Sequence, residues 1–136
     1  MRRSGTTGNP KGVLLSHQNV VADAKMINAA LKTGENKNFL CFLPLFHVNA
    51  MLTCMSSMDK GHQIVLRKTF SASEFWEQVE KHKINFWSAV PAVYQILLAD
   101  PTGQKYDLSS MEFGICGAAP LTEDLMHKFE NTFGVQ

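Results

Sequence analysis

Short apolar runs alternate with longer segments of helical periodicity along most of this chain. The runs at 39–43, 63–68, 84–90 and 112–116 are short and rich in Phe, Ile, Leu and Val, as buried strands are. Between them, apolar residues recur every three or four positions, which is typical of amphipathic helices. Strands that alternate with helices form a parallel sheet through right-handed crossovers. We therefore expect an α/β fold with a mostly parallel sheet and helices on both faces.

Capping residues mark the first expected helix. Ser16 follows an apolar, strand-like run at 12–15 and is a good N-cap, and Gly34 is a plausible stop. The predicted buried stripe of this helix contains Val20, Ala24, Ile27 and Leu31.

The remaining helices are expected at similar signals. The segment 46–58 is apolar nearly all round, which predicts a buried helix that stops at Gly61. Ser71 and Glu74 have the spacing of a capping box. Pro91 suits the first turn of a helix that reaches Leu98, and 100–103 reads as a loop. Thr122 is expected to cap a last helix that buries Leu125, Phe129 and Phe133 and ends at Gly134.

Composition excludes several classes of protein. With 136 residues, 45% hydrophobic and 18% charged, the chain is one ordered domain or part of one. A net charge of +1 provides no electrostatic footprint for nucleic acid or an acidic membrane. The apolar segment 39–58 is interrupted by polar residues, so no membrane span is expected. Three separated cysteines and the lack of a signal peptide favour a cytoplasmic, reducing compartment.

The two ends of the sequence do not read as domain ends. A Gly-rich loop begins at Ser4 with no apolar strand ahead of it, and 134–136 resembles the start of a further strand. We therefore expect residues 1–136 to be part of a larger domain.

The segment 4–12 carries the strongest chemical signal. It reads Ser-Gly-Thr-Thr-Gly-Asn-Pro-Lys-Gly, with three glycines, three hydroxyls and one lysine. Glycines allow backbone N–H groups to face one concavity, and hydroxyls and a lysine add donors, which suits a polyphosphate. The spacing fits neither a Walker A loop nor GxGxxG. A flexible turn without a ligand is the alternative.

The order of these residues closely resembles the phosphate-binding signature of the adenylate-forming superfamily, which holds acyl-CoA synthetases, luciferases and adenylation domains. Two later segments match in the same order. The segment 43–47, Leu-Pro-Leu-Phe-His, resembles the aromatic/His motif of the family, and 117–121, Gly-Ala-Ala-Pro-Leu, resembles its Gly-Gly-Ala-Pro-Leu turn. The resemblance runs from Ser4 to Gln136, and Ala118 replaces a glycine of the family pattern.

This resemblance implies an AMP-forming acyl-CoA ligase, which uses ATP with Mg2+ and then coenzyme A to convert a carboxylic acid, fatty or related, into its thioester. It implies that the β- and γ-phosphates are held by Ser4, Gly5, Thr6, Thr7, Gly8 and Lys11. His47 matches the residue between the acyl pocket and the nucleotide. The turn Gly117, Ala118, Ala119 and Pro120 matches the one beside the adenine and the acyl group.

The sequence departs from the family at its ends. Arg2 and Arg3 stand where the family has an aromatic and a hydroxyl residue. The Tyr-Gly-x-Thr-Glu segment that helps hold magnesium, the ribose-binding Asp and the small C-terminal domain with its lysine would follow Gln136. The chain by itself is therefore expected to be inactive and to self-associate.

Other interpretations stay open at this point. His47 between two apolar residues also suits a core position, and Trp76 and Trp87 are expected to pack in the core, with an acyl-pocket role as the alternative for Trp87. Met51, Met55 and Met58 fit core packing or an acyl-chain wall. The other histidines have no zinc-ligand spacing. The competing functions are a stand-alone nucleotide- or phosphate-binding module and a self-assembling structural module.

Overall fold

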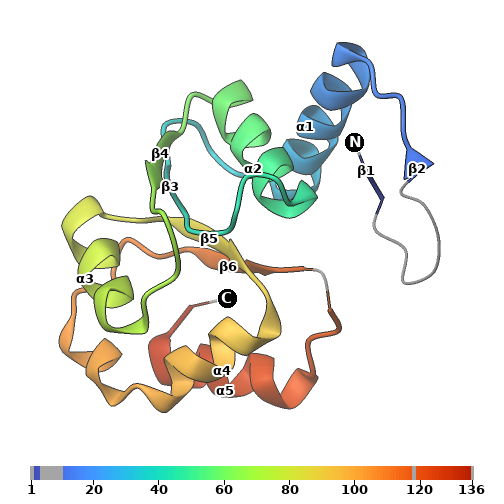
Figure 1. Ribbon diagram of the computed structural model, residues 1–136. Coiled ribbons are helices and arrows are strands. Elements are labelled where there is room, and N and C mark those ends of the chain that lie inside the picture. Colours follow the sequence, from blue (N-terminus) through green and yellow to red (C-terminus); the bar gives the residue numbers. More distant parts are fainter. Residues whose placement is uncertain (1, 4–10, 118, 136) are drawn as a thin grey trace.

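A four-stranded parallel sheet organises the part of the chain that the computed structural model describes, residues 2–3, 11–117 and 119–135 (Figure 1). The elements in chain order are β1 (Arg2–Arg3), β2 (Lys11–Gly12), α1 (His17–Leu31), β3 (Asn38–Cys41), α2 (Val48–Asp59), β4 (Gln63–Leu66), α3 (Ala72–His82), β5 (Phe86–Ala89), α4 (Pro91–Ala99), a 3-10 helix (Pro101–Lys105), β6 (Phe113–Cys116) and α5 (Glu123–Phe133). The strand order is β4-β3-β5-β6, and all neighbours in this sheet are parallel.

Alternating side chains cover the two faces of this sheet with different helices. Phe39, Cys41 and Phe86 pack with residues of α2 on one face, and α1 lies against α2. Leu40 and Trp87 point to the opposite face, into a cluster with residues of α3, α4 and α5. Figure 1 shows this division, with α1 and α2 on one side of the strands and the other three helices on the other side. The expected α/β fold with helices on both faces is confirmed.

Aromatic rings fill the larger of the two cores. Trp76 and Trp87 are almost completely buried, and the ring of Trp76 lies 4.4 Å from that of Phe133. The ring of Trp87 lies 5.6 Å from Phe75 and 6.0 Å from Phe129, between centroids. Both tryptophans are therefore core residues, as expected, and the alternative role of Trp87 in an acyl pocket is wrong because its ring is enclosed.

Two of the predicted N-caps are made as expected. The Ser16 hydroxyl accepts from the N–H of Asn19 at 3.2 Å, and the Asn19 side chain accepts from the N–H of Ser16, which completes a capping box. Thr122 Oγ1 accepts from the N–H of Leu125 at 3.3 Å at the start of α5. Gly134 ends α5 in the left-handed conformation, with φ of 68°.

Two other predictions at helix ends are wrong: the stop of α1 at Gly34 and the capping box of α3. Helix α1 ends before Gly34, because Lys32 adopts the left-handed conformation and its N–H donates to the carbonyl of Asn28. Ser71 is the N-cap of α3 but its side chain makes no capping bond. The expected capping box is absent there because the Glu74 carboxylate pairs with the guanidinium of Arg67.

The start of the described chain also differs from expectation. The apolar run at 12–15 forms no strand beyond Gly12, and Leu14 is 99% exposed. Instead Lys11–Gly12 pairs with Arg2–Arg3 in an antiparallel hairpin, so a short strand does precede the Gly-rich segment. Residues 101–105, partly predicted as a loop, form a 3-10 helix, at whose start Asp100 Oδ1 accepts from the N–H of Thr102 at 3.0 Å.

Helix α2 is buried on one face only, not all round. Its buried residues are small or weakly polar: Ala50, Thr53, Cys54, Ser56 and Ser57. Met55 and Met58 are exposed, so the predicted core role of these side chains is wrong. The small buried face lets α2 approach both the sheet and α1, where Asn28 Nδ2 donates to the Ser56 carbonyl at 3.1 Å.

The three cysteines are free thiols, and two of them meet in the fold. Cys41 at the end of β3 and Cys54 on α2 are buried with their Sγ atoms 3.6 Å apart. The hydrogen bond with Cys54, together with burial, raises the pKa of the Cys41 thiol. Within the described ranges, no helix is long and apolar enough to cross a membrane.

Gly103 offers a test of the aromatic core. A Cβ at this position would lie 2.5 Å from Trp76 Cε2 and 2.7 Å from Phe133 Cε1, so both rings must move in Gly103→Ala. We expect a loss of about 1–3 kcal/mol in the free energy of unfolding, as for other overpacked cores. Urea denaturation measures it. Gly12→Ala is the control, since no heavy atom lies within 4 Å of its Cβ. Equal stability of the two variants would contradict this packing.

Candidate functional site

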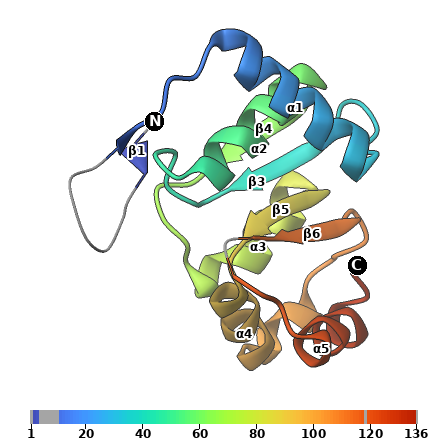
Figure 2. The ribbon, with the colours of Figure 1, turned by 90° about the vertical axis from the view of Figure 1, so that its right-hand side faces the viewer.

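The carboxyl edge of the sheet is the place where the fold can form a binding crevice. From β3 the chain crosses to β4 on one side and then returns to β5 on the other side of β3. Helix α2 therefore leaves the end of β3 on one face, while α4 leaves the end of β5 on the opposite face (Figure 2). Ligands of open α/β sheets bind at such a reversal of strand order.

An apolar cavity of about 370 Å³ lies between α1, α2 and the end of β6. Its lining comes from three elements that are far apart in the sequence: Ile27, Ala30, Leu31, Val48, Asn49, Leu52, Thr53, Ile115 and Gly117. The volume is that of a small-molecule site, and such sites combine apolar walls with a few placed polar groups. Here the polar side chains are those of Asn49 and Thr53.

Asn49 is held by contacts with its neighbours. The Ser88 hydroxyl of β5 donates to Asn49 Oδ1 at 2.6 Å, and the Thr53 hydroxyl donates to the Asn49 carbonyl at 2.8 Å. Gly117 lies so close that a Cβ there would be 2.7 Å from Asn49 Nδ2. Asn49 therefore joins the first turn of α2 to the ends of β5 and β6.

His47 is exposed at the start of α2, immediately before the cavity-lining Val48. It is the N-cap residue of α2, and its backbone N–H donates to the Pro44 carbonyl at 2.9 Å. Its ring lies 5.1 Å from that of Phe46, which is 84% exposed. The alternative of a core histidine is therefore wrong, and the position suits a group that meets a ligand.

The predicted phosphate-binding residues are described only in part. Ser4, Gly5, Thr6, Thr7, Gly8 and Ala118 lie outside the described residues. The backbone of Lys11 pairs with Arg3 in the hairpin. In the predicted turn, the N–H of Gly117 donates to the Ala89 carbonyl at 3.0 Å, and Ala119 and Pro120 are exposed. Gly117 thus lies at the cavity, directly after β6.

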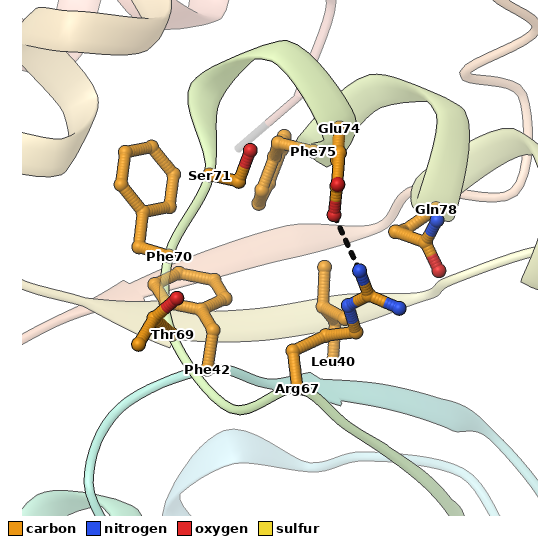
Figure 3. Close-up of a pocket in the computed structure, with 9 residues that line it drawn as sticks. All are labelled: Leu40, Phe42, Arg67, Thr69, Phe70, Ser71, Glu74, Phe75 and Gln78. Atoms are coloured by element: carbon orange, nitrogen blue, oxygen red, sulfur yellow. Dashed lines mark hydrogen bonds and ion pairs between the residues drawn. The ribbon is translucent and has the colours of Figure 1, made fainter.

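A separate hollow beneath α3 is too small for a substrate. Figure 3 shows the ion pair between Arg67 and Glu74 beside the rings of Phe42, Phe70 and Phe75. The free space measures about 10 Å³, which holds no more than one water molecule. We interpret this hollow as the solvent-facing edge of the core.

A further cavity of about 480 Å³ lies between segments 43–46 and 66–68, at the ends of β3 and β4. It adjoins the predicted aromatic/His segment. In the described part of the chain, no three His, Cys, Asp or Glu side chains gather where they would hold a metal ion.

Sequence comparison decides the family. The family description "AMP-binding enzyme" matches residues 4–136. The chain belongs to this family. It is 37% identical over 134 residues to the long-chain-fatty-acid–CoA ligase of Bacillus subtilis, with 96% of this chain and 24% of the relative covered.

Solved structures agree with this assignment. The inhibitor-bound N-terminal domain of FACL13 from Mycobacterium tuberculosis superposes with a TM-score of 0.93 at 28% identity, over 99% of this chain and 34% of that one. O-succinylbenzoate coenzyme A synthetase from Bacillus subtilis, in complex with ATP and magnesium ion, superposes with a TM-score of 0.85 at 28% identity, over 97% and 27%. The chain spans about a quarter of the length of these curated relatives.

Asn49 is the main site residue that the sequence did not indicate. It carries no motif, and its partner Ser88 lies 39 positions away. The one available signal was its place two residues after His47, in the first turn of the predicted helix.

The exposure of His47 generates a prediction. We expect His47→Ala in the full-length protein to change turnover or acid preference by about 10-fold while the melting temperature stays within about 2 °C of the wild type. The expectation follows because His47 is exposed and its ring lies beside that of exposed Phe46. Calorimetry and steady-state kinetics measure the two effects. Marked destabilisation with normal kinetics would contradict it.

Proposed function

We propose that the full-length protein is an AMP-forming acyl-CoA ligase. One observation carries the proposal: an apolar cavity of about 370 Å³ is lined by Gly117, the first residue of the segment 117–121, and by Val48, which directly follows the segment 43–47. A module that bound only phosphate would need no apolar cavity beside these segments, and this favours the ligase over the stand-alone module.

The proposed reaction has two steps. A carboxylate oxygen of the acid attacks the α-phosphorus of ATP, the bond to the β-phosphate oxygen breaks, and acyl-adenylate and pyrophosphate form. The thiol of coenzyme A then attacks the acyl carbonyl, loses its proton and displaces AMP. In this proposal Ser4, Gly5, Thr6, Thr7, Gly8 and Lys11 bind the phosphates and stabilise the leaving pyrophosphate, where negative charge develops.

In this proposal the carboxylic acid binds in the apolar cavity of about 370 Å³ between α1, α2 and the end of β6. His47 stands where the acid and the nucleotide meet, and the turn at 117–120 flanks the adenine and the acyl group. The apolar walls from α1 and α2 suit a fatty or related acid, and the fatty-acid ligase similarity supports this choice. Mg2+ accompanies the ATP, as in the solved synthetase complex. No step is assigned to the ion, since the described residues gather no ligand set for it.

A cytoplasmic location is part of the proposal. Cys41 and Cys54 are 3.6 Å apart and unlinked, which suits a reducing compartment.

The phosphate-binding assignment is tested in the full-length protein. Lys11→Ala or Thr7→Ala should lower ATP–pyrophosphate exchange by about 10-fold or more, the scale of a lost charged phosphate contact. Lys25→Ala, which removes an exposed lysine of α1, is the matched control and should keep wild-type exchange. Wild-type ATP–pyrophosphate exchange in both Lys11→Ala and Thr7→Ala would contradict the proposal that segment 4–12 binds ATP.

The isolated chain of 136 residues is expected to self-associate. Phe46, Leu14 and Met58 are 84%, 99% and 63% exposed, and β4 and β6 are the two edges of the sheet. Exposed apolar area favours association at about 25 cal/mol per Å², and open edges recruit other strands. Light scattering over a dilution series should show a mass above 15.2 kDa that falls on dilution. A monodisperse monomer at high concentration would contradict this.

The same sample tests whether the isolated chain is competent to bind nucleotide. We expect no micromolar binding of MgATP by calorimetric titration, since the ribose-binding Asp of the family pattern is not among these 136 residues.

A further inference from the structure

We propose that Asn49 selects the acid: its amide nitrogen binds an oxygen carried by the substrate close to the carboxyl group, so the enzyme prefers acids with such an oxygen over plain alkanoic acids. This inference rests on the proposed ligase function and assigns the substrate class of the same site.

The amide of Asn49 is oriented by its oxygen. Ser88 Oγ donates to Oδ1 at 2.6 Å, and Ser88 is only 2% exposed, so the donor side of this bond is buried. Oδ1 is thereby occupied and Nδ2 points away from Ser88. Within the described part of the chain, no hydrogen-bond acceptor is bound to Nδ2, although Nδ2 belongs to a cavity-lining residue.

The cavity offers this nitrogen no alternative partner among its described lining residues. Seven of these are Ile, Leu, Val, Ala or Gly, and the Thr53 hydroxyl lies against the Asn49 carbonyl and Oδ1, with no bond to Nδ2. Asn49 is half-buried and its Nδ2 is not among the fully buried polar atoms, so the amide can meet solvent while the cavity is empty. A ligand that fills the cavity removes that solvent, and a donor then left without an acceptor is costly. A ligand that supplies an acceptor removes that cost, and a site built around such a donor discriminates strongly against the analogue that lacks it.

The chemistry of the amide determines what it selects. An amide nitrogen only donates, so the matching substrate group is an acceptor: a hydroxyl, ether or carbonyl oxygen. Gly117 is required for this arrangement, because a Cβ there would lie 2.7 Å from Nδ2 and displace it.

The place of Asn49 determines where the oxygen sits. Asn49 is two residues from His47 and touches the turn at Gly117, at the end of the cavity assigned to the carboxyl group. The opposite wall, Ile27, Ala30 and Leu31 of α1, is apolar and receives the rest of the skeleton. The selected acids are therefore oxygenated near the carboxyl group and apolar beyond it.

The test uses the full-length enzyme and three acids of equal chain length: hexanoate, 3-hydroxyhexanoate as separate enantiomers, and 5-hydroxyhexanoate. The readout is kcat/KM for pyrophosphate release. For the wild type we expect one 3-hydroxy enantiomer to exceed both hexanoate and the 5-hydroxy acid by about 10-fold or more, the effect of one well-placed hydrogen bond.

Variants assign that preference to the amide. Asn49→Leu removes the donor and should bring the ratio between 3-hydroxyhexanoate and hexanoate to about 1. Asn49→Asp keeps the acceptor for Ser88 but has no amide donor, so it should also lose the preference. Ser88 is not one of the cavity-lining residues, and Ser88→Ala leaves the amide of Asn49 in place but removes the bond that orients it. This variant should therefore reduce the ratio only in part. Asn131→Leu, at an exposed position of α5, should leave the ratio unchanged.

Two results would overturn the inference. The first is a wild-type enzyme that releases pyrophosphate equally with hexanoate and 3-hydroxyhexanoate. The second is an unchanged ratio in Asn49→Leu and Asn49→Asp; if kcat/KM also falls equally for every acid, the role of Asn49 is structural. If the ligase proposal itself is wrong, the wild type releases no pyrophosphate with any acid, and this result contradicts both proposals.

Discussion

The burial of both faces of β3 is the constraint on which the rest of this structure depends. Phe39, Leu40 and Cys41 are each at most 2% exposed, although their side chains alternate between opposite faces. A central parallel strand can be buried in this way only if helices cover both sides of the sheet. The chain meets this requirement by crossing to β4 and back to β5, with α2 on one face and α3 to α5 on the other.

That division of helices also creates the site. Because α2 and α4 leave neighbouring strand ends on opposite faces, the carboxyl edge is left open between them. The small residues of α2 bring its first turn close to β5 and β6, so that Asn49 bonds to Ser88 and contacts Gly117. A larger residue at position 117 would separate these elements. One set of small residues thus serves both the packing and the polar end of the cavity.

Local sequence signals predicted the structure correctly where a residue interacts with residues close to it in the sequence. The capping residues Ser16 and Thr122 act on N–H groups three positions away, so their role could be inferred directly. The same reasoning failed at Glu74, because Arg67 arrives from the end of β4 and competes for the carboxylate. It failed for α2 as well, since hydrophobicity alone does not reveal which face of a helix meets the sheet.

The sequence by itself determined the alternation of the four sheet strands with the helices, the parallel sheet and the family, because periodicity and contiguous motifs are properties of short segments. It placed His47 and Gly117 at strand ends, but it did not reveal that Asn49, Ser88 and Gly117 meet, nor that Cys41 and Cys54 lie 3.6 Å apart. Only the tertiary structure decided these contacts. These contacts form because α2 packs close to the sheet, and the distance between them depends on the side-chain volumes of several elements at once.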